Sequence, residues 1–286
     1  MNRFEAFRAL HRAGRPLFLP NAWDRASAAA LAALAARGFP AIGTTSLGVA
    51  AAAGLPDAAG ATRETTLWLA RDLVRLPVLV SVDIEGGFGA TPEDVAELAA
   101  DLERLGVAGV NIEDGRPGGA GLADPALQCE LITAMKRTAP GLFVNARTDT
   151  YWLGTAEDDQ ADDRAERAEE TRRRAAAYLA AGADGIFVPG LADEGAIAAL
   201  ADGLGAPLNV LLPQGGPGLS RLAALGVSRV STGSLLFRAA LHAAVDSACR
   251  ALEGAPLPAG LPSYADAQDL AAAYAPPSTR RPGRPG

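Results

Sequence analysis

The chain has 286 residues, of which 49% are hydrophobic and 21% charged, and its formal net charge is −7 with a pI near 5.0. This composition excludes extensive disorder, and the negative charge argues against a nucleic-acid partner because no basic surface is available to neutralise phosphates. The two cysteines, Cys129 and Cys249, lack neighbouring metal-ligand residues, and no run of about 18 apolar residues occurs, so we expect a cytoplasmic protein without disulfides, zinc or a membrane span.

Short apolar runs rich in β-branched residues alternate with longer stretches of helical period along most of the chain. Strands are expected at 17–20, 40–44, 78–83, 109–112, 142–146, 185–188, 208–211 and 228–231. Helices are expected at 22–37, 63–75, 92–105, 124–137, 164–181, 193–201, 218–225 and 233–252, with one further short helix at 262–274. Eight consecutive strand–helix units predict an α/β fold, a (β/α)8 TIM-type barrel with an extra C-terminal helix, and a doubly wound sheet is the alternative.

This pattern divides the chain into a barrel at residues 1–255, a C-terminal helical extension at 256–275 and a tail at 276–286. The tail is rich in proline and glycine and has no apolar anchor, which predicts disorder. The dense charge run at 157–174 predicts a solvated helix face, with a mobile flap as the alternative.

Polar side chains follow neighbouring strands of the expected barrel, where the active sites of such barrels are built. Asp83 and Glu85 follow the third strand, Glu113 the fourth and Arg147 the fifth. Converging carboxylates repel one another unless a cation lies among them, and oxygen-only ligands favour Mg²⁺ or Mn²⁺ over zinc. A divalent metal site at the barrel mouth is therefore expected, and ordinary salt bridges at the rim are the alternative.

Other catalytic chemistries lack their residues at this rim. His242, Cys129 and Cys249 fall within expected helices, and His11 lies in the amphipathic start of the chain, away from the strand ends. Structural roles are the better interpretation for all four. The only lysine, Lys136, also lies in a helix. Neither a Ser-His-Asp arrangement nor a Schiff-base amine is therefore expected at the barrel mouth.

Five segments in chain order resemble the isocitrate lyase and phosphoenolpyruvate mutase superfamily: FLPNAWD, AIGTTSLGVAAAAGLPD, VSVDIEGGFG, GVNIEDG and NARTD. The resemblance covers about residues 15–250, and each segment falls at an expected strand end. Members of this superfamily are (β/α)8 barrels that bind Mg²⁺ and make or break a C–C or C–P bond next to a pyruvate-like unit. The resemblance implies the same fold, metal and reaction class here.

The family pattern can be transferred position by position. It implies metal-binding acids at Asp57, Asp83, Glu85 and Glu113, several of them acting through metal-bound water. It implies catalytic roles for Arg147 and Thr45, and a substrate cradle that also includes Ser46, Leu47 and Asn209. Many members have Asp at the position of Glu85, so this acid is expected to approach the metal differently.

One departure from the family narrows the expected reaction. Isocitrate and methylisocitrate lyases carry a K-[KR]-C-G-H flap after the fourth strand, whose cysteine is the acid–base group, whereas this chain reads DGRPGGAGLAD. The Lys and Asn of the mutase flap are also missing. Oxaloacetate-decarboxylase-like chemistry is therefore favoured, because loss of CO₂ needs no general base.

The alternatives are a mutase or hydrolase acting on phosphonopyruvate or phosphoenolpyruvate, a carboxyvinyl-carboxyphosphonate phosphorylmutase-like enzyme, or a non-catalytic barrel that binds a small carboxylate. The family usually assembles through its C-terminal helices, and the expected helices beyond residue 233 are rich in Ala and Leu. A homo-oligomer, either a dimer or a tetramer, is expected.

Overall fold

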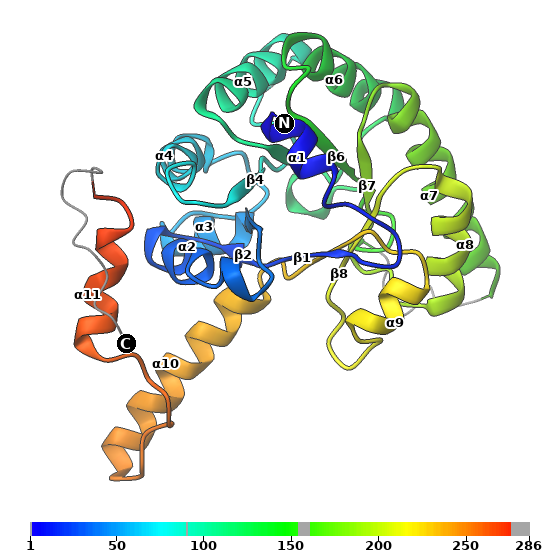
Figure 1. The fold of residues 1–286 in the computed structure, drawn as a ribbon. Helices are drawn as coiled ribbons and strands as arrows, with labels where there is room; N and C mark the ends of the chain where they lie inside the picture. The colour runs from blue at the N-terminus through cyan, green and yellow to red at the C-terminus, as the bar shows by residue number, and fades with distance from the viewer. Residues whose placement is uncertain (1, 90, 154–160, 276–286) are drawn as a thin grey trace.

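The computed structural model describes residues 2–89, 91–153 and 161–275, and Figure 1 shows strands gathered at the centre with helices around them. The strands are all parallel and follow the order β1-β9-β8-β7-β6-β5-β4-β3-β2. They are β1 (Leu17–Leu19), β2 (Asn21–Ala22), β3 (Ala41–Thr44), β4 (Leu79–Asp83), β5 (Gly109–Glu113), β6 (Phe143–Arg147), β7 (Gly185–Phe187), β8 (Leu208–Leu211) and β9 (Arg229–Ser231). Each expected strand is present with bounds within one residue, except that the first is divided in two.

Proline explains that division and the closure of the barrel. β1 and β2 are separated only by Pro20, which has no N–H to donate. β1 pairs with β9 and β2 pairs with β3, so the two edges of the sheet are consecutive in the chain. The backbone continues the ladder across the break, because the Pro20 carbonyl accepts from Gly43 N at 2.9 Å. The predicted TIM-type barrel is thus confirmed, and the doubly wound alternative is wrong.

Each of the nine expected helices is present. They are α2 (Arg25–Ala32) with the 3-10 turn η1 (Ala35–Arg37), α4 (Arg63–Leu73), α5 (Pro92–Leu105), α6 (Pro125–Thr138), α7 (Ala161–Ala180), α8 (Glu194–Leu204), α9 (Leu219–Ala224), α10 (Leu235–Glu253) and α11 (Tyr264–Ala272). Local chemistry fixes their ends: Thr91 and Asp94 form a capping box at the start of α5, and Gly106 closes that helix with φ 95°.

Two short helices and one 3-10 turn were not expected. They are α1 (Arg3–Arg8), α3 (Ser46–Ala52) and the turn η2 (Pro117–Gly119). Six or seven residues give too few apolar positions for a helical period, and the Ser and Gly of α3 resemble a loop. In the charge run, residues 161–174 lie in α7, and residues 157–160 lie outside the described residues. The tail at 276–286 also lies outside them.

The amino end of the barrel is closed by an apolar plug. Phe7 of α1 and Phe143 of β6 are fully buried there with their ring centroids 5.4 Å apart. The imidazole of His11 stacks on Phe143 at 4.5 Å, and burial together with the nearby charge of Arg229 lowers the pKa of His11 to about 3. His11 is therefore a neutral packing residue at the end opposite the strands' carboxyl termini.

The C-terminal helices leave the barrel wall. In Figure 1, α10 extends away from the barrel and α11 turns back beside α2. Tyr274, just after α11, donates a hydrogen bond from its hydroxyl to the Arg25 carbonyl at 2.7 Å. Of the helices in the described part of the chain, none has the length and apolarity needed to cross a bilayer.

Candidate active site

A cavity of about 330 Å³ opens at the carboxyl ends of the strands. Asp83, Glu113 and Arg147 end three neighbouring strands, β4, β5 and β6, and all three line it. Parallel pairing places Glu113 directly beside Arg147. Seven of the sequence-predicted site residues meet on this cavity wall: Thr45, Ser46, Leu47, Asp57, Asp83, Glu113 and Arg147.

Arg147 is held in place by two acids. Its Nη1 lies 2.6 Å from Glu113 Oε2, while its Nε and Nη2 donate to the two oxygens of Asp149 at 2.6 and 2.9 Å. The two hydrogen bonds to Asp149 use two of the five guanidinium N–H groups, and Nη1 is held by its ion pair with Glu113. Burial lowers the pKa of Arg147, but the charges of Glu113 and Asp149 raise it more, so the side chain remains a cation. Arg147 thus lines the cavity as a cation whose position is fixed by two acids.

The carboxylates at the mouth have more negative charge around them than positive. Burial raises the pKa of Asp83 to about 6 despite the opposing effect of Arg147. Burial also raises the pKa of Glu113 to about 8, and the negative charges of Asp83, Asp149 and Asp57 add to this shift. A cation bound at this wall would offset the burial and the repulsion that raise these pKa values.

The donors on this wall fit a hydrated divalent cation. Asp57, Asp83 and Glu113 supply oxygen ligands only, as Mg²⁺ and Mn²⁺ prefer. Within the described ranges no three acidic, histidine or cysteine side chains already lie close enough to form a ready metal cage. Mg²⁺ usually keeps several waters, so a wall of separated carboxylates suits it better than it suits zinc.

Glu85 has a different place from the other expected metal ligands. Its buried carboxylate accepts hydrogen bonds from Thr62 Oγ1 at 2.6 Å and Gly60 N at 2.9 Å, and it lines a second cavity of about 390 Å³. The backbone turns sharply here, with φ 51° at Glu85. Glu85 therefore fixes the 57–62 loop, which also carries Asp57, and does not line the cavity that holds Asp83.

The substrate cradle expected at α3 presents backbone donors. Thr45 is the N-cap of this helix, and the first bond of the helix runs from Val49 N to the Thr45 carbonyl. The N–H groups of Ser46 and Leu47 precede that bond and lie on the cavity wall without a partner in the described part of the chain. These two N–H groups can donate to an anion.

Asn209 does not reach the cavity. It is buried below the wall, where its Oδ1 accepts from Ser231 Oγ at 3.1 Å and its Nδ2 has no partner in the described chain. Ser231 itself lines the cavity. The expected strand asparagine is therefore separated from the cavity by Ser231.

The structure also adds residues to which the sequence assigned no role. Asp149 orients Arg147, and Trp152, Phe187 and Pro189 add apolar surface to the cavity wall. Asp149 belongs to the NARTD segment, so its position at a strand end was a usable signal. The apolar side had none, because aromatic residues after a strand are equally typical of packing.

The loop that replaces the lyase flap is short and tied to itself. Gly115 and Leu122 form an antiparallel bridge, and Arg116 N donates to the Gly121 carbonyl at 2.9 Å. Arg116 lines the cavity, whereas Asp124 caps α6 by accepting from Ala126 N at 2.9 Å. The described part of this loop therefore offers the cavity a cation and no proton-donating acid.

Comparison with known proteins agrees with this geometry. The family model described as phosphoenolpyruvate phosphomutase matches residues 7–252. An uncharacterised protein of Mycobacterium tuberculosis is 43% identical over 263 residues, covering 92% of this chain and 95% of its own. The 2-methylisocitrate lyase of Halalkalibacterium halodurans is 35% identical over 71% of this chain and 65% of its own. An oxaloacetate decarboxylase of Ectopseudomonas mendocina is also 35% identical, over 61% of this chain and 58% of its own.

Solved structures of lyase-, mutase- and hydrolase-type proteins are also similar to this chain. A protein of Burkholderia cenocepacia described as a candidate lyase or mutase superposes with a TM-score of 0.80 at 36% identity, covering 96% of this chain and 97% of its own. A candidate phosphonomutase of the same organism gives 0.78 at 37% identity, with 88% and 98% covered. A phosphonopyruvate hydrolase solved with oxalate and Mg²⁺ shares the fold at 23% identity, with a TM-score of 0.77 over 95% of each chain.

Proposed function

Because the chain belongs to the phosphoenolpyruvate mutase and isocitrate lyase family, we propose that it is a Mg²⁺-dependent enzyme that decarboxylates an oxaloacetate-type 2-oxo acid. Mn²⁺ is the alternative ion. The observation that supports this most directly is Arg147, a cation on the cavity wall that Glu113 and Asp149 fix in place near Asp83. Enzymes of this family bind small carboxylate substrates, and a cavity of about 330 Å³ suits a molecule of that size.

The residues of the wall divide the work. Asp83 and Glu113, with Asp57 nearby, hold the ion, whose contribution when bound is to polarise a carbonyl oxygen as a Lewis acid. The N–H groups of Ser46 and Leu47 bind the carboxylate of the 2-oxo unit, with Thr45 beside them. Arg147 donates one N–H to that carboxylate and one to the oxo oxygen. When the bond to the departing CO₂ breaks, its electron pair moves toward the oxo oxygen, and Arg147 stabilises the charge that develops there. The enolate that remains takes up one proton from water, at the carbon that carried the CO₂, and becomes pyruvate.

The missing flap cysteine favours this reaction over isocitrate cleavage. Departure of CO₂ needs no general base, and the departing fragment needs no proton. The loop at 115–124 offers only Arg116 and Asp124 as ionisable groups, and Asp124 is engaged in capping α6. Retro-aldol cleavage would need an acid that this loop does not supply.

A direct assay tests the proposal. Pyruvate release from oxaloacetate would be followed with Mg²⁺ and with EDTA, and Arg147→Gln provides the matched control for the spontaneous metal-catalysed reaction. We expect saturable, Mg²⁺-dependent turnover that the variant loses. Oxalate binding without turnover of any 2-oxo acid would instead indicate a non-catalytic carboxylate-binding barrel.

A second candidate reaction is cleavage or rearrangement of a C–P bond. The similarity to the candidate phosphonomutase of Burkholderia cenocepacia favours it, and Arg116 at the mouth provides a cation for a phosphonate group. Phosphonopyruvate assayed beside oxaloacetate separates the two reactions. A kcat/KM for phosphonopyruvate above that for oxaloacetate would favour the C–P reaction.

We also propose that the enzyme is a homo-oligomer, a dimer or a tetramer. On α10, Leu241, Val245 and Leu252 are 52%, 64% and 89% exposed, although they are large apolar side chains. Burying them against a second copy removes that apolar surface from water. Light scattering at micromolar concentration is expected to report a dimer or larger, and a monomer would contradict this assembly.

A further inference from the structure

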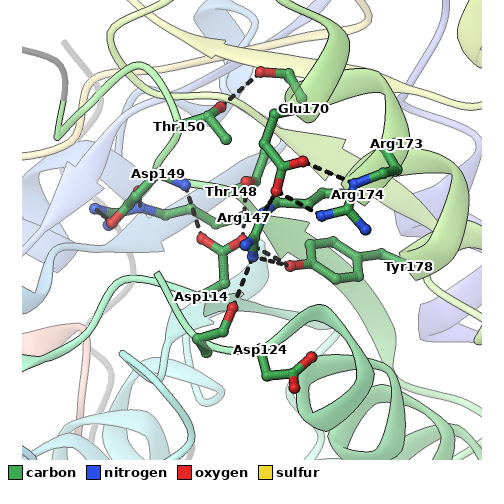
Figure 2. Close-up of polar contacts among 12 residues, drawn as sticks. Asp114, Asp124, Arg147, Thr148, Asp149, Thr150, Glu170, Arg173, Arg174 and Tyr178 are labelled. Carbon is green, nitrogen blue, oxygen red and sulfur yellow. Dashed lines mark hydrogen bonds and ion pairs between the residues drawn. The ribbon is translucent and has the colours of Figure 1, made fainter. Parts of the chain in front are cut away.

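We propose that Arg174 and Tyr178, both on α7, are positioning residues that hold Arg147 in its substrate-binding pose through Asp114 and Asp149. This inference rests on the proposed function, in which Arg147 binds the substrate. Figure 2 shows the cluster, with the side chains of α7 meeting the ends of β5 and β6. Neither residue lines the cavity, so both act only through other side chains.

Asp114 is the centre of this cluster. Its side chain is 0% exposed, and its Oδ2 accepts from Tyr178 OH at 2.7 Å, Thr148 Oγ1 at 2.9 Å and Arg174 Nη1 at 3.0 Å. Its other oxygen, Oδ1, accepts from Asp149 N at 2.9 Å. A buried carboxylate is stable only when its lone pairs are satisfied, so the α7 donors fix where Asp114 lies.

Asp149 connects the cluster to Arg147, the proposed substrate-binding arginine. Asp114 fixes the backbone of Asp149, and the Asp149 carboxylate takes the Nε and Nη2 groups of Arg147. Gly115 leaves space for the Asp149 carboxylate beside Arg147, because a Cβ at position 115 would clash with Asp149 Oδ2. A displacement of Asp149 therefore moves the guanidinium, and displacements of about 1 Å in a catalytic group carry large losses of rate.

Arg174 also links this cluster to the loop beside the cavity. Its Nη1 lies 2.9 Å from the carbonyl of Ala123, and Ala123 N donates to the Asp114 carbonyl at 2.7 Å. The 115–122 loop and Arg147 thus share one anchor. Burial and the neighbouring Asp114 charge raise the pKa of Tyr178, so its hydroxyl stays protonated and remains a donor.

The chain provides a matched control one residue away. Arg174 pairs with Glu170 at 2.6 Å, and Arg173 pairs with the same carboxylate at 2.7 Å. The Arg173 side chain, however, is 56% exposed and makes no contact with Asp114. Tyr178→Phe removes one donor to Asp114 and keeps the ring, and Arg174→Lys keeps the charge while losing the guanidinium. Arg173→Ala tests whether loss of a charge from this helix has any effect of its own.

The experiment measures oxalate affinity with Mg²⁺ by calorimetry, together with KM and kcat for oxaloacetate and the melting temperature. We expect Tyr178→Phe to weaken oxalate binding and raise KM about tenfold, the scale for loss of a hydrogen bond to a charged group, with a smaller change in kcat. Arg174→Lys should act in the same direction, and Arg173→Ala should change neither affinity nor KM. In an Arg147→Gln background, Tyr178→Phe should cause no further loss, because its effect passes through Arg147.

A purely structural role gives a different result. Tyr178→Phe would then lower the melting temperature but leave oxalate affinity and KM unchanged, which would overturn the proposal. Failure of the proposed function is distinguishable from this. If the wild-type protein binds no oxalate, the crystal structure of Tyr178→Phe still decides: a displaced Arg147 guanidinium supports positioning, and an unchanged pose overturns it.

Discussion

The two ends of the barrel are built from the same strands and differ in almost every property. β6 contributes Phe143 to the apolar plug at one end and Arg147 to the charged cavity at the other. At the amino end Phe7, Leu17, Leu19 and Phe143 form an apolar cluster, and at the carboxyl end acids with raised pKa values face a cavity. The comparison teaches that stability and chemistry are separated along the barrel axis, so changes at the two ends should have different consequences.

A polar layer lies between these ends. Asn111 and Asn145 bond to each other at 2.9 Å, and Arg229 reaches Asn111 at 3.2 Å from the other side of the barrel. Arg229 is fully buried, and this burial lowers its pKa to about 9. The layer gives the cavity a rigid polar floor instead of an apolar one.

The largest expected effect is at the mouth. Asp83→Ala should reduce kcat/KM for the 2-oxo acid by about 10³-fold or more, because in the proposed function this acid is a ligand of the ion. Mg²⁺ binding by calorimetry should weaken in parallel. The metal-free variant should melt no lower than the wild type, since Asp83 is a destabilised acid in the folded state. If neither metal binding nor activity changes in an intact fold, the metal role of Asp83 is wrong.

The opposite end should lose stability instead. Phe7→Ala opens a cavity under the plug and should lower the free energy of unfolding by about 3–4 kcal/mol, as measured by denaturant titration. Activity per folded molecule should stay close to that of the wild type. A large loss of kcat in molecules that remain folded would contradict the separation of the two ends.

The loop over the mouth should also restrict the substrate. Isocitrate and 2-methylisocitrate should be cleaved at least about 10²-fold more slowly than oxaloacetate is decarboxylated, because no acid in the loop can protonate the departing carbanion. The assay follows glyoxylate and pyruvate release from each substrate. Turnover of either isocitrate at about 1 s⁻¹ or above would contradict this and indicate an acid supplied from elsewhere.

The smallest expected effect is a dependence on pH. Because burial raises the pKa of Glu113 to about 8 and that of Asp83 to about 6, the folded metal-free protein binds more protons than the unfolded chain between about pH 5 and 8. Its stability should therefore fall as the pH rises through this window. Mg²⁺ replaces those protons, so the increase in melting temperature that it causes should grow by about 3 °C over the same range.

Melting curves at several pH values, with and without Mg²⁺, check this dependence. Glu113→Gln cannot titrate at that position, so its metal-free stability should vary less with pH. A wild-type stability that rises from pH 5 to 8 without metal would show that the two acids are not destabilised in the fold.

The sequence predicted the barrel and the positions of Asp83, Glu113 and Arg147 because strand ends in a parallel sheet are neighbours whatever the loops do. It did not predict the turn that directs Glu85 away from Asp83, because a positive φ at a non-glycine residue leaves no pattern in one sequence. The strand ends together with the family resemblance therefore gave four acids in one group, and the structure brings three of them to the cavity wall.

The charged helix α7 shows a second limit of prediction from the sequence. Residues 161–174 expose most of their charges, as expected of a solvated face, yet Thr171, Arg174, Ala175 and Tyr178 form a buried stripe at helical spacing. A stripe containing Arg and Tyr does not look apolar, so hydrophobic periodicity overlooks it. Its partner, Asp114, is 60 positions from Arg174 in the chain, and only the fold brings them together.

The break at Pro20 has a consequence for folding during synthesis. Next to it, the Asn21 side chain accepts from Thr232 N and Gly233 N at 3.0 Å each, across 211 and 212 positions of sequence. Contacts of such long range form late, because the chain between them must first be ordered. On the ribosome, β1 is synthesised early, but it can pair with β9 only after nearly the whole chain has been synthesised. A nascent chain that stops short of residue 229 already contains Asp83, Glu113 and Arg147, but the wall that should surround them stays open.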